Sequence, residues 1–135
     1  MHEKDYSHRD VLDKLGVKPG HALALDERAF ALDPDLRRRI AERSGESGGR
    51  LDVVLVTVDA STDAVETLQA WKQRIRPAGG IWLLSPKRKQ PGYVDQNELI
   101  GAGKLAGVVD NKVCSVSETV SAMRFVIRRG DRPTK

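Results

Sequence analysis

Several residue types that mark particular protein classes are scarce or absent in this chain of 135 residues. One cysteine, Cys114, excludes an internal disulfide framework and a cysteine-rich zinc site, and it agrees with a reducing compartment. His2, His8 and His21 lack the spacing of metal ligands, so no metal is predicted. No apolar run reaches the roughly 18 residues that span a membrane. The charged N-terminus lacks the apolar segment of a signal peptide, and we therefore expect a cytoplasmic protein.

Aromatic residues make up only 4% of the chain, which leaves few side chains for stacking on single-stranded nucleic acid. The formal net charge of +4 mildly favours anionic partners. The basic residues are spread over several segments, with the densest runs at 37–39, 87–89 and 128–129. Such runs are typical of solvated helix faces and tails as well as of binding sites. Binding to nucleic acid would therefore rest on charge alone.

The clearest positive pattern is a βαβ unit over residues 51–89. Two apolar runs without polar alternation, 53–56 and 81–84, predict parallel strands that are covered on both faces. Between them, apolar residues at spacings of three and four over 65–75 predict a helix, which proline and glycine at 77–80 end. In such units ligands bind at the carboxyl ends of the strands. The basic run that follows the second strand is therefore well placed for a binding site.

Capping residues mark the starts of the predicted helices. A short N-terminal helix begins at Ser7, and a later one begins at Asp33, with proline at its first position. Ser61 or Thr62 caps the helix of the βαβ unit, and Asp95 caps a helix that extends to about Lys104.

Three more strands are predicted outside the βαβ unit, over 21–25, 107–116 and 123–129. Residues 117–122 are too few for a helical crossover, so the last two strands should pair as an antiparallel hairpin. We expect an α/β protein with a three-layer Rossmann-like fold, whose mostly parallel sheet of about five strands ends in that hairpin. This order resembles a methyltransferase-like topology that lacks one or two early strands. A single domain should cover 1–135, with frayed ends at 1–6 and 130–135.

Five segments carry a more specific resemblance. They are Leu15-Gly16-Val17-Lys18-Pro19-Gly20, Asp52-Val53-Val54, Gly80-Ile81-Trp82-Leu83 with Pro86-Lys87, Gly107-Val108-Val109-Asp110-Asn111-Lys112-Val113-Cys114, and Arg124-Phe125-Val126. Over about residues 6–132 the chain resembles the bacterial family labelled domain of unknown function 3052. Residues 107–132 are the most specific part of this resemblance. It implies a small cytoplasmic bacterial protein of methyltransferase-like fold, and it implies no established activity.

A methyltransferase of this fold needs a glycine-rich turn after its first strand, because the cofactor approaches the backbone closely. Here that turn, residues 26–30, contains no glycine, and no second strand ends in an acid for the ribose hydroxyls. No Gly-x-x-x-x-Gly-Lys-Ser/Thr phosphate loop is present either. The sequence therefore predicts no cofactor, neither S-adenosylmethionine nor a dinucleotide.

The candidate ligand-binding residues all lie at predicted strand ends. They are Asp26, Asp59, Ser85, Lys87, Arg88 and Lys89. The two aspartates either accept hydrogen bonds from a ligand or form turns and helix caps. The basic residues lie in a loop between Pro86 and Pro91, where they form either a fixed cationic rim for phosphate or carboxylate, or a solvated loop.

These patterns predict a non-catalytic binding or regulatory module for an anionic small molecule or a protein partner. An enzyme acting on a phosphorylated small molecule is the alternative, and a nucleic-acid-binding protein is a further one. No catalytic residue is predicted, because Cys114 has no histidine near it in the sequence that would activate a thiolate. Asp110, Asn111 and Lys112 lie inside a predicted strand and either face a partner or pair with Arg124 across the hairpin.

Overall fold

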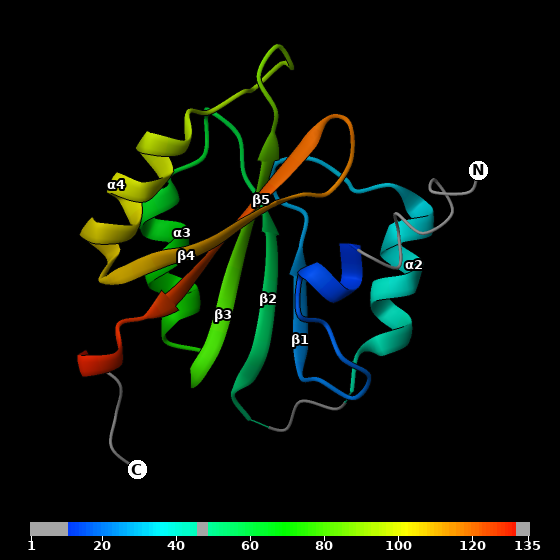
Figure 1. The fold of residues 1–135 in the computed structure, drawn as a ribbon, viewed down its shortest axis with the longest axis vertical. Helices are drawn as coiled ribbons and strands as arrows, with labels where there is room; N and C mark the ends of the chain where they lie inside the picture. Colours follow the sequence, from blue (N-terminus) through cyan, green and yellow to red (C-terminus); the bar gives the residue numbers. More distant parts are fainter. Residues whose placement is uncertain (1–10, 46–48, 132–135) are drawn as a thin grey trace.

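Five strands form one sheet in the computed structural model, which describes residues 11–45 and 49–131 (Figure 1). They are β1 (Leu23–Asp26), β2 (Leu51–Thr57), β3 (Ile75–Pro86), β4 (Val108–Ser115) and β5 (Val120–Ile127). Their spatial order is β1-β2-β3-β5-β4. The first three run parallel, and β5 is antiparallel to both of its neighbours. The predicted mixed sheet with a closing antiparallel hairpin is therefore confirmed.

Three helices with both ends among the described residues flank this sheet, and an aspartate caps each of them. They are α2 (Pro34–Arg43), α3 (Ala64–Lys72) and α4 (Gln96–Ala106). The caps at Asp33 and Asp95 were predicted, whereas α3 is capped by Asp63 and not by Ser61 or Thr62. Ser7 lies outside the described residues, although 11–14 are helical. Among the described residues, no helix combines the length and apolarity needed to cross a membrane.

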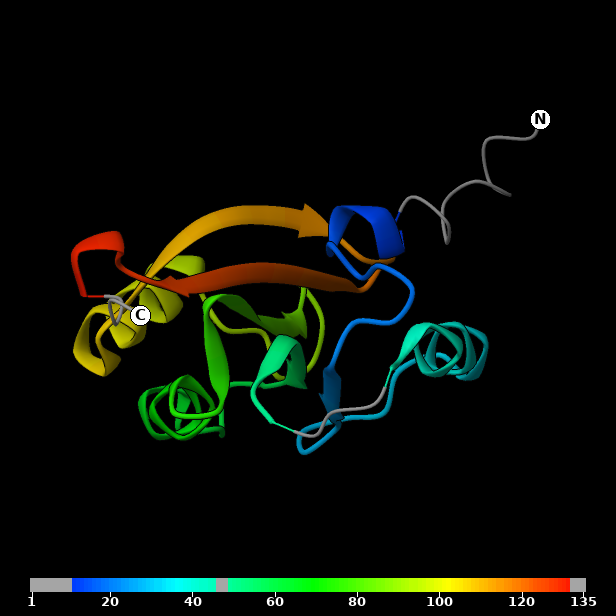
Figure 2. The ribbon, with the colours of Figure 1, turned by 90° about the horizontal axis from the view of Figure 1, so that it is seen from below.

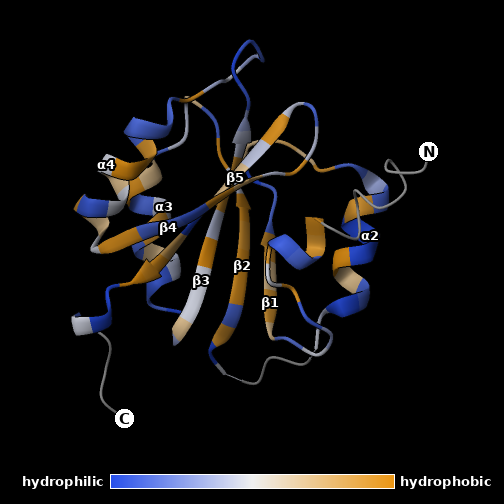
Figure 3. Ribbon diagram, in the orientation of Figure 1, coloured by the Kyte–Doolittle hydropathy of each residue, from blue (hydrophilic) through white to orange (hydrophobic). Residues whose placement is uncertain are grey.

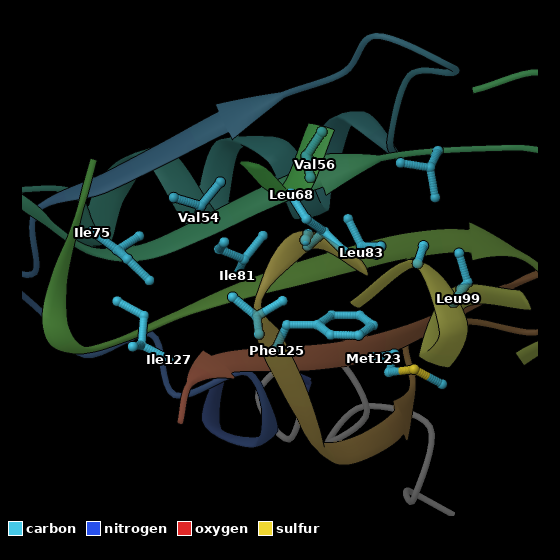
Figure 4. Packing of buried hydrophobic residues seen from close by; sticks show 14 of the residues in the cluster. Val54, Val56, Leu68, Ile75, Ile81, Leu83, Leu99, Met123, Phe125 and Ile127 are labelled. Carbon is cyan, nitrogen blue, oxygen red and sulfur yellow. The ribbon is translucent and has the colours of Figure 1, made fainter. Parts of the chain in front are cut away.

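The two faces of the sheet carry separate groups of buried apolar side chains. On one face Val54, Ile81 and Phe125 pack with residues of α3 and α4 (Figure 4). On the other face Leu55 and Trp82 pack with α2 and with residues 11–17. Seen from below, the helices lie on both sides of the strands (Figure 2), and the strands are the most apolar part of the ribbon (Figure 3). Neighbouring residues such as Val54 and Leu55 belong to different groups because successive strand residues point to opposite faces of the sheet.

The boundary between α3 and β3 differs from the prediction. Ile75 was expected on the apolar side of the helix, but α3 ends at Lys72 and Ile75 is the first residue of β3. The strand therefore includes Pro77, and its pairing with β2 is irregular there, since Leu51 faces Ile75 whereas Val53 faces Gly80. A single buried residue fits a helical spacing and a strand start equally well, so the pattern alone could not separate them.

The remaining boundaries shift by a few residues. The first strand begins at Leu23, because His21 makes only an isolated bridge with Ser44. The last strand runs from Val120 to Ile127, and a 3₁₀ turn, η1 (Arg129–Asp131), follows it. Of the ends predicted to fray, 1–6 and 132–135 lie outside the described residues.

Candidate functional site

The basic loop, residues 87–89, follows β3 and is attached to the turn between β4 and β5. The backbone N–H of Lys87 donates to the carbonyl of Thr119 at 2.8 Å, and its Nζ donates to Oγ of Ser115 at 2.7 Å. The N–H of Gln90 donates to the carbonyl of Lys87 at 3.0 Å and closes the loop. The end of β4, through Ser115, and the turn after it, through Thr119, therefore hold the loop in place.

The other two cations of this loop extend into solvent. Arg88 and Lys89 are exposed, and neither forms an ion pair with any residue in the described part of the chain. Lys89 has a φ of 77°, in the left-handed region that turns use. The positive charge of these two side chains is therefore available to an anion.

Beside the loop lies a cavity of about 560 Å³, which we call the basic-loop hollow. The polar side chains that line it are Ser85, Lys87, Arg88, Asp95, Gln96, Asn97 and Ser121, with Tyr93 also at its wall. Ser85 is 6% exposed and faces Ser121 across the sheet, and Ser121 in turn faces Ser115. The carboxylate of Asp95 accepts a hydrogen bond from the N–H of Asn97 at 2.8 Å. Three predicted ligand residues, Ser85, Lys87 and Arg88, thus come together here.

Asp59 has a structural role in the turn that follows β2. Its Oδ1 accepts hydrogen bonds from the N–H and the hydroxyl of Ser61, at 2.9 and 2.7 Å, and from the hydroxyl of Thr62 at 3.1 Å. The two bonds from Ser61 lower the pKa of the Asp59 carboxyl below its ordinary value. Asp59 also lines a second cavity, of about 370 Å³, which shares Pro86 with the basic-loop hollow.

Asp26 is likewise engaged by its neighbours and lines neither of these two cavities. Its Oδ2 lies 2.9 Å from Nη2 of Arg28, whose Nη1 donates to the hydroxyl of Thr67 at 3.1 Å. Asp26 and Asp59 therefore line neither cavity together, and each is held by neighbours in its own turn.

Thr57, which the sequence gave no reason to select, fixes the turn after β1. Its fully buried hydroxyl accepts from the N–H groups of Ala29 and Phe30 at 3.1 and 3.2 Å, and it donates to the carbonyl of Phe30 at 3.0 Å. One side chain of β2 thus satisfies three backbone groups of a turn that has no regular structure.

The sequence analysis also missed Asn97, Ser115 and Ser121 as residues near the candidate site. Asn97 was assigned to a predicted helix, Ser115 to a predicted strand and Ser121 to the connection at 117–122, and none of them to a role. The predicted hairpin gave no signal for this contact, because it pairs the last two strands with each other and leaves open which of them lies beside the strand that precedes the basic loop. The structure places the last strand there, with Ser121 opposite Ser85.

The family of the chain follows from comparison with known sequences. The model of the family described as protein of unknown function (DUF3052) matches residues 13–129. The chain belongs to this family. No curated protein matches the sequence.

Solved structures with a similar fold include methyltransferases of low sequence identity. A SAM dependent methyltransferase from Aquifex aeolicus gives a TM-score of 0.59 at 13% identity, over 90% of this chain and 89% of that one. A methyltransferase from Pyrococcus furiosus gives a TM-score of 0.55 at 13% identity, over 88% of this chain and 80% of that one. Mitomycin 7-O-methyltransferase gives 0.57 at 12% identity, but the chain spans only 54% of its length. At these identities the likeness establishes a methyltransferase-like fold and no activity.

Proposed function

We propose that this member of the family is a non-catalytic module that binds a small anionic molecule in the basic-loop hollow. The observation that carries the proposal is the convergence of Lys87 and Arg88 with the hydroxyls of Ser85 and Ser121 around one cavity. Cationic side chains with hydroxyl and amide groups are the usual partners of phosphate and carboxylate oxygens. The volume of about 560 Å³ is that of a small-molecule site.

The charges around the hollow support the same ligand class. Lys87 and Arg88 contribute two positive charges, and Asp95 is the one acidic residue among those that line it. The carboxylate of Asp95 already accepts the hydrogen bond that caps α4, at 2.8 Å from the N–H of Asn97. The wall therefore carries an excess of positive charge, which favours an anion.

S-adenosylmethionine does not fit the turn after β1, although one relative in fold is a SAM dependent methyltransferase. The N–H groups of Ala29 and Phe30 already donate to Thr57, and the Arg28 guanidinium occupies the space between Asp26 and Thr67. The turn also has a side chain at every position, so the backbone is not open to close approach. We infer a three-layer, methyltransferase-like Rossmann fold in which the cofactor turn has become part of the scaffold.

The proposal predicts that phosphate, or another small anion, raises the melting temperature of the protein. At ten times its Kd a ligand that binds only the folded state stabilises it by about 1.4 kcal/mol. We expect Lys87→Ala/Arg88→Ala to abolish this gain, because it removes both cations that line the hollow. Thermal unfolding with and without phosphate, at constant ionic strength, measures the effect.

Arg128 and Arg129 provide a matched control for the same loss of charge. Both are exposed, and they follow β5 at the end of the sheet away from the basic loop. The run 37–39 is less suitable, because Arg37 pairs with Glu27 and Arg38 pairs with Asp35 and Glu42. Equal losses in Lys87→Ala/Arg88→Ala and Arg128→Ala/Arg129→Ala would indicate diffuse electrostatics instead of a site. No stabilisation of the wild type by any anion would leave a protein partner as the better explanation.

A further inference from the structure

A second cationic cavity lies on the other face of the sheet. This sheet-face hollow has a volume of about 290 Å³, and its charged walls include Lys14, Asp52, Arg76, Lys112 and Arg124. Lys112 and Arg124 lie in register with Trp82, which packs against the residues at 11–17. Ser85 lies three residues after Trp82 along β3, and Ser121 lies three residues before Arg124 along β5. Because successive strand residues alternate between faces, these two serines of the basic-loop hollow point to the opposite face.

The acids of the sheet-face hollow already have partners. The Oδ1 of Asp52 lies 2.8 Å from Nε of Arg76, and its Oδ2 accepts a hydrogen bond from the N–H of Ala22 at 2.9 Å. Asp13, which also lines the hollow, lies 3.6 Å from Arg43. Within the described residues Lys14 and Lys112 form no ion pair. The hollow therefore keeps uncompensated positive charge.

The strand pairing brings two of its cations directly opposite each other. Lys112 faces Arg124 across the closing hairpin, and the pairing is irregular immediately before it, between Asp110 and Lys112. Like charges directly opposite each other on neighbouring strands destabilise a sheet. Bulges of this kind redirect side chains and are common beside binding sites.

The side chain of Arg124 is positioned by a glycine on the neighbouring strand. A Cβ added to Gly80 would lie 2.5 Å from Nε of Arg124, so the guanidinium passes over β3 where a side chain is absent. Lys14 and Lys112 line the same hollow. Both also act on the thiol of Cys114: burial raises its pKa, and the two positive charges oppose that rise. Cations from three separate segments thus converge on one small cavity.

We propose that the sheet-face hollow is a second anion site, which binds the phosphate group of a small molecule or free phosphate through Lys14, Lys112 and Arg124. The cavity is at the lower end of the range for small-molecule sites, which favours a single phosphate group over a larger ligand. This site is independent of the proposed function, because it shares no lining residue with the basic-loop hollow.

Amide chemical shifts measured by NMR during titration with inorganic phosphate test the proposal. We expect saturable shifts at Gly79, Lys112 and Arg124, with a Kd below about 1 mM. Lys14→Ala/Lys112→Ala should raise that Kd by about tenfold or more, because two of the three proposed cations are lost. Lys72→Ala/Lys104→Ala, which removes the same charge from α3 and α4 on the other face, should change it by less than about twofold.

Two further arms make the test decisive. Lys87→Ala/Arg88→Ala should leave the phosphate-induced shifts at Lys112 unchanged. Loss of binding at the basic-loop hollow can therefore be told apart from loss of binding at the sheet-face hollow. Titration with ribose 5-phosphate distinguishes the sources of the phosphate group, since tighter binding than inorganic phosphate indicates a phosphorylated metabolite and equal binding indicates the free ion. Absence of saturable shifts around Lys112, or equal weakening by the two lysine double variants, would overturn the proposal.

Discussion

At the scale of single residues, the structure separates the candidate site into predictable and unpredictable parts. Ser85, Lys87 and Arg88 were identified from their position after a buried strand, and they do share a cavity. Asp26 and Asp59 had the same kind of position but are held by Arg28 and by Ser61. A carboxylate at a strand end can accept hydrogen bonds from several nearby donors. The geometry of the turn decides which donor it meets, and sequence spacing does not fix that geometry.

Phe125 is among the largest fully buried side chains of the core. Its ring is fully buried on the face that α3 and α4 cover, and a Cβ added to Gly103 of α4 would lie 2.6 Å from its Cε2 (Figure 4). We expect Phe125→Ala to lower the free energy of unfolding by about 3 to 5 kcal/mol, because it leaves a cavity in the core. Chemical denaturation measures this, with Val113→Ala, at a position 47% exposed, as the control. A loss below about 1 kcal/mol would contradict the tight packing of this ring.

At the scale of helices and strands, the signals that involve several residues were more reliable than single markers. The cap, proline and acid at 33–35 and the cap at Asp95 correctly gave the starts of α2 and α4. For α3 the candidates Ser61 and Thr62 were wrong, because both hydroxyls donate to Asp59 instead. Ser, Thr and Asp near one another all offer the same type of acceptor, so their order alone could not identify the cap.

The assignment of the α3 cap can be tested by substitution. The Oδ1 of Asp63 accepts the N–H of Glu66 at 3.0 Å, and replacement by alanine leaves that donor unpaired. We expect Asp63→Ala to lower the free energy of unfolding by about 0.5 to 2 kcal/mol, and Asp63→Asn to lose much less, since asparagine also caps helices. Urea denaturation of both variants measures the difference. If the asparagine variant is as unstable as the alanine variant, the side chain stabilises the protein through its charge and not through the cap.

At the scale of the whole molecule, the order of elements was sufficient to predict a mostly parallel sheet with a closing antiparallel hairpin, but not which strand lies beside β3. The short connection at 117–122 predicted the antiparallel hairpin, and the helix-containing connections predicted the parallel strands. The same reasoning did not reveal that Thr57 would fasten the turn after β1 to the neighbouring strand, since that contact joins residues 27 positions apart. Contacts of this range depend on the register between strands, which local patterns leave open.

This contact underlies a prediction about the cofactor of the fold relatives. Because Thr57 and Arg28 already occupy the turn after β1, we expect S-adenosylmethionine to bind more weakly than about 100 μM, equivalent to about 5.5 kcal/mol. Isothermal titration calorimetry of the purified protein with the cofactor measures this. Tighter binding would mean that the turn rearranges to admit the ligand, and the hydrogen bonds of Thr57 would then have to break.

The irregular strand β4 also has a consequence for how the molecule behaves at high concentration. Its outer side is a free edge of the sheet among the described residues, eight residues long, and such edges can recruit strands from other molecules. The irregularity between Asp110 and Lys112 interrupts the ladder that an incoming strand would need, and the exposed ammonium of Lys112 lies at its centre. The defect in the sheet therefore protects the protein from growing into aggregates by strand addition.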